Sequence, residues 1–481
     1  MKTHNLDTRM TSRAFREAVL DVYPDAAYKP ERLRLLLLLL LCPWVDAEGR
    51  TVLDYSQLAA CGNADSKGRN FKAADLLTDF EAHVMPLSLT GPEWRSKASL
   101  SRARTALPVW PQTVLDALRA ELEAHSRDRL RDAVYFVSGR PYKPRQHREQ
   151  LTMYRRQALE ELLAHDHPAL DLMRYANSQQ GTVFARMVEK HGDAARAAAL
   201  RLSKPGPDGQ PDPVATQAAQ WHALRILHGL ESEAQPFYKP SRTGKTARVF
   251  ADGLSYLGLS KPVRRALMPD CPELDLTNAQ LAIAAQDWEV PEVQAFLSTG
   301  AKVWPELERH FQLEPDTYKP VLKSTLYALL FGMERGAIVR HLAHGGAGEH
   351  GRGIGEEKAG RLFDHPLIGA LYRARERQLA SLKEAGHART VFGQTFPVTD
   401  GESARSALAA QAQAVELWLL LPAVELLRGN RDLTLVAWQH DGFTVHSSDK
   451  SKTERYVRQL QDAVRERAEQ AGYCTRLERS E

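Results

Sequence analysis

The stretch RDLTLVAWQHDGFTVHS at residues 431–447 constrains the fold more than any other part of the chain. Apolar residues flank His440-Asp441-Gly442 on both sides, and they predict two short strands. Asp-Gly between two such runs is the strongest short signal for a hairpin turn. The sequence therefore predicts a hairpin that carries the Asp441 carboxylate at its tip. Because aspartate is also a common turn residue, its role depends on what the rest of the chain brings near it.

The chain has 481 residues, more than one ordinary hydrophobic core organises, so we expect several structural units. An apolar fraction of 43% and a charged fraction of 26% are typical of a globular protein. The net charge of +4 is too small to indicate an anionic partner by itself. The four cysteines lack the spacing of a metal or redox site, which predicts free thiols and a cytoplasmic location.

Residues 1–110 combine helical patterns with turns. Leu35–Leu41 is the only strongly apolar block in this interpretation, and it is shorter than the roughly 20 residues that a membrane helix needs. It predicts a buried helix and no membrane partner. Val52–Cys61 and Phe71–Val84 predict two further helices, which form either a helix-turn-helix or an ordinary helical hairpin.

The segment 127–156 interleaves basic residues with aromatic ones. This composition fits a nucleic-acid backbone, and it equally fits a solvated helix face with aromatic residues in the core. Gly244-Lys245-Thr246 invites a phosphate-loop interpretation, but the glycine that this motif needs is replaced by Lys239. A Walker-type nucleotide site is therefore excluded.

A second aspartate has a local setting comparable to that of Asp441. Glu273–Thr277 predicts a short strand and a helical pattern begins at Ala279, so Asp275 lies where a strand gives way to a helix. Hard divalent cations prefer carboxylate oxygens. Two such ions about 4 Å apart stabilise the attacking and leaving oxygens of a phosphoryl transfer. Sequence spacing alone does not bring Asp275 and Asp441 together.

Between the two aspartates lies KPVLKSTLYALLFGM, residues 319–333. Lys319, Lys323, Tyr327 and Phe331 recur every four residues and so follow one face of a helix. Basic residues at the start of this face suit a triphosphate, and the aromatic residues further along suit a sugar and base. An amphipathic core helix with lysines at its rim is the alternative.

These three motifs, in this order, resemble the DNA polymerase I family (family A) and the related single-subunit phage and mitochondrial RNA polymerases. The resemblance covers about residues 240–450. It implies that Asp275 and Asp441, with the backbone carbonyl of Leu276, hold two Mg²⁺ ions, for which Mn²⁺ can substitute. It also implies that Lys319 and Lys323 contact the incoming triphosphate, with Lys323 also catalytic, and that Tyr327 and Phe331 stack on the nucleotide.

Shorter segments are similar to the same family. They are TARVF at 246–250, VRRAL at 263–267 and RSALAAQAQA at 405–414, together with the histidine before Asp441. The resemblance implies DNA contacts for Arg248, Arg264, Arg405, Gln413 and His440.

The implied fold is an α+β right-hand polymerase, mostly helical, with an antiparallel palm sheet and helical fingers and thumb. The expected regions are an N-terminal helical region at 1–110, a thumb-like region at 111–245, a first palm segment at 246–318, fingers at 319–388 and a second palm segment at 389–481.

The chain departs from the family pattern at three positions. Gln280 stands where the DNA polymerases carry a glutamate that closes off the space of a ribose 2′-hydroxyl, and it is assigned to the nucleotide site. Gly442 replaces the carboxylate that commonly follows the second aspartate. Lys319 replaces an arginine and keeps the charge without the bidentate fork. Gln280, Tyr327 and Phe331 together favour deoxynucleotides over ribonucleotides.

The resulting expectation is a template-directed DNA polymerase without a proofreading exonuclease, encoded by a plasmid, phage or other mobile element. Its partners would be primer–template DNA, deoxynucleoside triphosphates and replication accessory proteins. One alternative is an RNA polymerase or primase on the same scaffold. Another is a non-catalytic DNA-binding replication protein.

Overall fold

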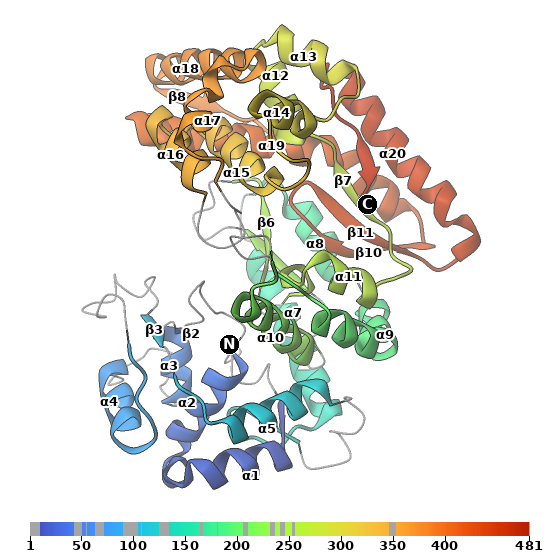
Figure 1. The fold of residues 1–481 in the computed structure, drawn as a ribbon. Coiled ribbons are helices and arrows are strands. Elements are labelled where there is room, and N and C mark those ends of the chain that lie inside the picture. Colours follow the sequence, from blue (N-terminus) through green and yellow to red (C-terminus); the bar gives the residue numbers. More distant parts are fainter. Residues whose placement is uncertain are drawn as a thin grey trace. The chain divides into compact units, whose positions relative to one another are not determined.

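The structure is a computed structural model, and it describes residues 10–42, 51–53, 55–62, 72–89, 104–106, 108–124, 134–163, 167–179, 181–204, 210–230, 236–240, 246–252, 255–345 and 353–480. The turn expected between the helices Val52–Cys61 and Phe71–Val84 lies outside these residues, and so does the beginning of the basic segment 127–156. Within them the chain is mostly helical, with small antiparallel sheets (Figure 1).

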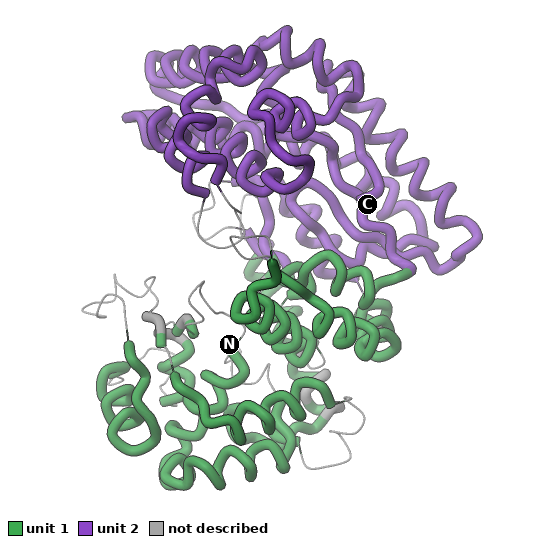
Figure 2. Tube along the Cα trace, viewed as in Figure 1, with its two compact units in different colours: residues 1–162, 180–237, 251–269 green, residues 163–179, 238–250, 270–481 purple. Residues whose placement is uncertain are grey.

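The chain divides into two compact units (Figure 2). Unit 1 comprises residues 1–162, 180–237 and 251–269, and unit 2 comprises residues 163–179, 238–250 and 270–481. The five regions expected from the sequence are a finer division, and their boundaries stay predictions.

Unit 1 is built mainly of helices. Its elements are β1 (Met10–Ser12), α1 (Arg13–Val22), η2 (Pro24–Tyr28), α2 (Pro30–Leu41), β2 (Thr51–Leu53), α3 (Tyr55–Cys61), α4 (Ala73–His83), β3 (Arg104–Ala106), α5 (Gln112–Glu123), β4 (Val134–Phe136), α7 (Pro144–Leu162), α9 (Thr182–Leu200), α10 (Pro213–Leu230), η4 (Tyr256–Gly258) and α11 (Lys261–Leu267). β1 pairs with β4 and β2 with β3, both antiparallel.

The buried helix predicted for the leucine run is confirmed as α2. Pro30 lies in its first turn, where the missing N–H of proline costs no hydrogen bond. Leu35 to Leu40 are all fully buried, as expected of a helix that is apolar on every side. The first of the two further helices begins at Tyr55 rather than Val52, because Thr51–Leu53 form strand β2.

In the segment 127–156, two aromatic residues belong to a small hydrophobic cluster. Phe136 on β4 packs with Met10 and Val134, and Tyr142 meets the Phe136 ring edge-on at 5.3 Å. The Arg140 guanidinium lies 5.9 Å from the Phe136 ring centroid. For Phe136 and Tyr142 the structure therefore favours the core interpretation over a stacking surface for nucleic acid.

Unit 2 contains a four-stranded antiparallel sheet in the order β10-β11-β7-β12. Its elements are α8 (Leu170–Ser178), β7 (Glu273–Leu276), α12 (Ala279–Asp287), α13 (Pro291–Ser298), α14 (Val303–Phe311), α15 (Lys319–Leu330), α16 (Arg335–His344), α17 (Glu356–Gly360), η6 (Leu362–Asp364), α18 (Pro366–Ala385), β8 (His387–Arg389), β9 (Thr395–Pro397), α19 (Gly401–Gly429), β10 (Leu433–Trp438), β11 (Gly442–Ser447), η7 (Lys450–Lys452), α20 (Thr453–Gln470) and β12 (Leu477–Arg479). β5 (Phe237–Pro240) and β6 (Val249–Asp252) pair with each other where the chain passes between the units.

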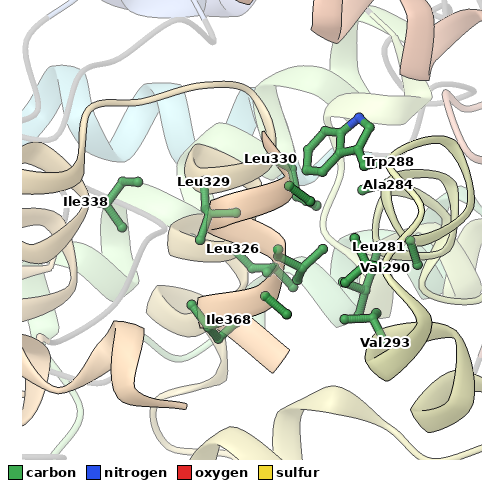
Figure 3. Packing of buried hydrophobic residues seen from close by; sticks show 14 of the residues in the cluster. Leu281, Ala284, Trp288, Val290, Val293, Leu326, Leu329, Leu330, Ile338 and Ile368 are labelled. Carbon is green, nitrogen blue, oxygen red and sulfur yellow. The ribbon is translucent and has the colours of Figure 1, made fainter. Parts of the chain in front are cut away.

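The core of unit 2 lies among its helices. Apolar residues of α12 to α18 and of the first turns of α19 form one buried cluster. Figure 3 shows Leu281 and Ala284 of α12 on the same side of α15 as Leu330, and Leu329 on the side where Ile338 of α16 lies. Because α12 and α15 share this core, it fixes the helix that follows β7 against the helix that carries the basic and aromatic face.

α19 is the long central helix of unit 2. Asp400 and Ser403 form a capping box at its start, which satisfies backbone N–H groups that the helix leaves free. By length and composition it is the one helix among the described residues that could cross a membrane, but 61% of its most apolar window is buried in the structure, as in a core helix. The expectation that Leu35–Leu41 is the only strongly apolar block is therefore wrong.

Candidate active site

Asp275 lies in the middle of the sheet of unit 2. On β7 it is flanked by Gly442 of β11 on one side and by Glu478 of β12 on the other. Residues directly opposite each other in antiparallel strands project from the same face of the sheet. Glu478 therefore brings a second carboxylate beside Asp275, and the Arg476 Nε donates to its Oε1 at 2.6 Å.

Gly442 leaves room for Asp275. A Cβ on Gly442 would lie 2.1 Å from the backbone oxygen of Leu274 and 2.5 Å from Asp275 Oδ1. The first contact is with backbone, so no side-chain rotation relieves it. The absence of a carboxylate after Asp441 thus has a local cause, because every larger residue at 442 collides with β7.

The hairpin of β10 and β11 is confirmed, but its turn differs from the expected one. The Gln439 N–H donates to the Gly442 carbonyl at 2.8 Å, so His440 and Asp441 occupy the two central positions. Neither of them has a positive φ, whereas the Asp-Gly turn predicted from the sequence requires positive φ at both centres. Gly442 is the first residue of β11, and it is needed for close packing rather than for the turn.

The turn is attached to β7 by the backbone. The Leu276 N–H donates to the Asp441 carbonyl at 2.8 Å, which places Asp441 next to the end of the strand that carries Asp275. After Leu276 the chain turns into α12 through Asn278, which has a φ of +51°. Asparagine tolerates this left-handed conformation better than most residues. The structure therefore brings Asp275 and Asp441 to adjacent positions.

α15 carries Lys319, Lys323 and Tyr327, and Phe331 follows directly after its last residue. The Lys323 ammonium lies 5.6 Å from the centre of the Tyr327 ring, and that ring lies 6.2 Å from the ring of Phe331. Lys319 is exposed at the start of the helix, with its Nζ 3.8 Å from Asp316. Lys323 is also exposed, so both ammonium groups are accessible to an anion.

The end of α15 packs against α19. Gly332 has a φ of +85°, and a Cβ there would lie 2.6 Å from the Cγ of Arg405. Arg405 also lies 3.8 Å from Glu334. The buried Arg375 of α18 donates to the carbonyls of Leu329 and Met333 at 3.0 and 2.9 Å, and so caps the end of α15.

A buried carboxylate, Glu416 of α19, was missed by the sequence interpretation. Its side chain is 1% exposed and forms a two-pronged ion pair with Arg248, whose Nη2 and Nε lie 2.9 and 3.1 Å from Oε2. Gln280 of α12 donates its Nε2 to Glu416 Oε1 at 2.9 Å. Arg248 and Gln280, which motif similarity assigned to DNA and to nucleotide, are thus held by one side chain. A lone charge in the apolar run at 414–421 is the sequence signal that could have found it.

The charges of this network act on one another. Burial raises the pKa of Glu416, the Arg248 guanidinium opposes this shift and the charge of Asp441 adds to it. Burial also raises the pKa of Tyr327, and the negative charges of Asp441 and Glu416 add to the shift. Asp441, Glu416, Arg248 and Tyr327 therefore belong to one electrostatic cluster.

His440 is neutral in this setting. Burial, followed by the positive charge of Arg248, lowers the pKa of His440 to about 4. Its ring meets Phe250 edge-on, with 5.1 Å between ring centres. A neutral imidazole offers hydrogen bonds without adding a positive charge beside Asp441.

The remaining predicted DNA contacts lie in different places. Gln413 of α19 accepts a hydrogen bond from the Thr246 hydroxyl, next to Arg248. Arg264 lies on α11 in unit 1, where its Nη1 donates to the Leu259 carbonyl at 2.8 Å. The structure therefore groups Gln413 with Arg248, and it assigns Arg264 to the other compact unit.

The donor set suits a hard divalent cation. Asp275 and Asp441 supply carboxylate oxygens, the ligand type that Mg²⁺ prefers. Among the described residues no group of three or more histidine, cysteine, aspartate or glutamate side chains forms a metal site.

No protein-family model matches the chain, and no curated protein matches it. Among solved structures, the POL domain of Pol1 from M. smegmatis in complex with DNA primer-template and dNTP is similar at 15% identity and a TM-score of 0.42. That match covers 64% of this chain and 68% of the other. Similarity at this level is too low to assign a fold or an activity to this chain.

Proposed function

We propose that this chain is a template-directed DNA polymerase that adds deoxynucleotides to the 3′ end of a primer. The observation that carries the proposal is the pairing of Asp275 and Asp441, joined through the 2.8 Å hydrogen bond from Leu276 N–H to the Asp441 carbonyl. Two aspartates at adjacent backbone positions, together with a helix that carries exposed lysines and neighbouring aromatic residues, suit phosphoryl transfer between nucleotides. The order of the motifs along the chain supports the same activity.

In this proposal each group has a defined task. Asp275 and Asp441, with the Leu276 carbonyl, hold Mg²⁺ or Mn²⁺, which when bound stabilises charge on the attacking and leaving oxygens. Lys319 and Lys323 bind the triphosphate, and their charge offsets the charge that develops on the leaving pyrophosphate. Tyr327 and Phe331 stack on the base and sugar of the incoming nucleotide. Gln280 is held by Glu416 at the nucleotide site.

The proposal also assigns DNA contacts to five residues. Arg248, Gln413, Arg405 and His440 would contact primer and template, and Arg264 is likewise proposed to bind DNA. The proposal includes the absence of proofreading, a cytoplasmic location, a mobile-element origin and interaction with replication accessory proteins.

Primer extension tests the proposal. A primed template is incubated with Mg²⁺ and either deoxynucleotides or ribonucleotides, using the wild type and Asp441→Asn. We expect deoxynucleotide incorporation by the wild type and a loss of roughly 1000-fold or more in the variant, because several kcal/mol of transition-state stabilisation depend on the carboxylate. Asp462→Asn is the matched control, because Asp462 is exposed on α20 and pairs with Arg465.

Each alternative has its own outcome. Incorporation of ribonucleotides alone assigns the chain to RNA polymerases or primases. DNA binding without synthesis assigns it to non-catalytic replication proteins. Synthesis that persists in Asp441→Asn contradicts the two-aspartate assignment.

A further inference from the structure

The ion pair between Arg248 and Glu416 lies in the same unit as the two aspartates. Glu416 is 1% exposed, whereas the Arg248 side chain is 22% exposed, so the pair reaches from the core of unit 2 toward its surface. Removing one partner from a buried pair leaves an uncompensated charge, which is costly. Neither Arg248 nor Glu416 can therefore be neutralised alone without leaving the other charge uncompensated.

The same pair is coupled to Asp441. Arg248, Glu416 and Asp441 all act on the ionisation of Tyr327, and Asp441 acts on Glu416 directly. The geometry agrees, because Phe250, two residues after Arg248, meets the ring of His440, the residue before Asp441, with 5.1 Å between ring centres. A guanidinium attracts a nearby carboxylate and competes with any cation that the carboxylate would bind. Glu416 offsets that competition, because its two oxygens engage the guanidinium and cancel its charge.

We propose that Glu416 is a positioning residue that compensates the charge of Arg248 and so keeps the Asp441 carboxylate available to a divalent cation. This rests on the proposed function, since it assumes that Asp275 and Asp441 hold the cation. Gln280 completes the arrangement by donating to Oε1 of Glu416, so both oxygens of the buried carboxylate accept hydrogen bonds. Glu416 acts here through Arg248 and does not bind the cation itself.

Binding of Mn²⁺ to the full chain without DNA tests this role, with free Mn²⁺ followed by electron paramagnetic resonance. We expect Glu416→Gln to weaken binding about tenfold, because one negative charge is lost and Arg248 is left uncompensated. The double variant Arg248→Gln/Glu416→Gln removes both charges, and we expect it to bind within about threefold of the wild type. Glu425→Gln, an exposed position on the same helix, is the control and should bind as the wild type does.

The double variant separates charge compensation from a structural role. If Glu416 only stabilised the fold, removing its partner as well would restore nothing. Wild-type affinity in Glu416→Gln, or a double variant as weak as the single one, overturns the inference. If Glu416→Gln does not fold, the double variant alone decides, because a tenfold loss in it contradicts charge compensation.

The proposed function fails in a different way. Asp441→Asn should abolish Mn²⁺ binding. If the wild type binds no Mn²⁺, both the proposed metal site and this inference are wrong. If Asp441→Asn abolishes binding while Glu416→Gln leaves it unchanged, only the inference is overturned.

Discussion

Gly442 lies directly opposite Asp275 in the sheet, and a Cβ added to Gly442 would lie 2.5 Å from Asp275 Oδ1. The two residues are far apart in the chain, yet the identity of one restricts the other. A side chain at 442 would push β11 away from β7 or displace the Asp275 carboxylate. The glycine is therefore integral to how the aspartate is presented.

The first prediction concerns this contact. Gly442→Ala should lower the free energy of unfolding by about 1–3 kcal/mol, because overpacking forces the backbone to shift. Primer extension should fall by more than the loss of folded protein accounts for. Gly429→Ala is the control, because nothing lies within 4 Å of a Cβ there, and it should change stability by less than about 1 kcal/mol. Full primer-extension activity in Gly442→Ala would contradict the prediction, because it would mean that β11 can move away from β7 without affecting synthesis.

The second prediction concerns the cap on α15. Arg375 is 2% exposed and donates to the carbonyls of Leu329 and Met333. Arg375→Met should lower the free energy of unfolding in urea by about 2–4 kcal/mol, because two buried carbonyls lose a charged donor. Amide exchange should rise at the end of α15. Arg377→Met, at an exposed position of the same helix, should leave both measurements near the wild type; equal losses in the two variants would refute the cap.

The third prediction concerns pH and unit 1. The Arg32 guanidinium and the Lys29 ammonium, bonded to Asp79, hold the pKa of that carboxyl well below its usual range. A pKa lowered by folding contributes stability that is present above the unfolded value of about 4 and is lost as pH falls through the folded value. Asp79→Asn should therefore weaken unit 1 at pH 7 and flatten the acid dependence of its stability below pH of about 4. Asp116→Asn, at an exposed site, should keep the wild-type slope; an unchanged slope in Asp79→Asn would contradict the assignment.

The fourth prediction concerns two thiols. Burial raises the pKa of Cys61 in unit 1 and of Cys271 in unit 2 to about 12. Both should resist an aromatic disulfide reagent at pH 8 in the folded protein and react once their unit opens. With Cys61→Ser and Cys271→Ser variants, the labelling rate in rising urea would report each unit separately. Rapid labelling of either thiol without denaturant would contradict its burial.

The sequence predicted those elements of the candidate site whose geometry is local. α15, the strand that carries Asp275 and the turn and helix that follow this strand agree with the expected elements, because periodicity and turn residues determine them within a few positions. The hairpin was predicted as well, but the reason for Gly442 was not, since the strand that excludes a side chain there comes much earlier in the chain. The roles of these residues in catalysis and DNA binding stay predictions.

Long-range pairing accounts for what the sequence did not reveal. In the sequence Glu416 is a single charge in an apolar helical segment. Its partners Arg248 and Gln280 come from distant segments, so the sequence does not reveal them. Glu478 beside Asp275 was equally hidden, because register between strands separated by some two hundred residues is not encoded in either strand alone. Networks of side chains from distant segments can therefore be recognised only in the three-dimensional structure.

The sheet order also has a consequence for how the protein is made. β7 is paired on both sides, by β11 and β12, and both partners follow it in the chain by more than 160 residues. During synthesis β7 therefore leaves the ribosome long before either partner, whereas α12 to α18 can pack with one another first. Non-local strand pairing is slow, and an unpaired strand invites aggregation. Early packing of these helices would restrain β7 until the strands that complete the sheet are translated.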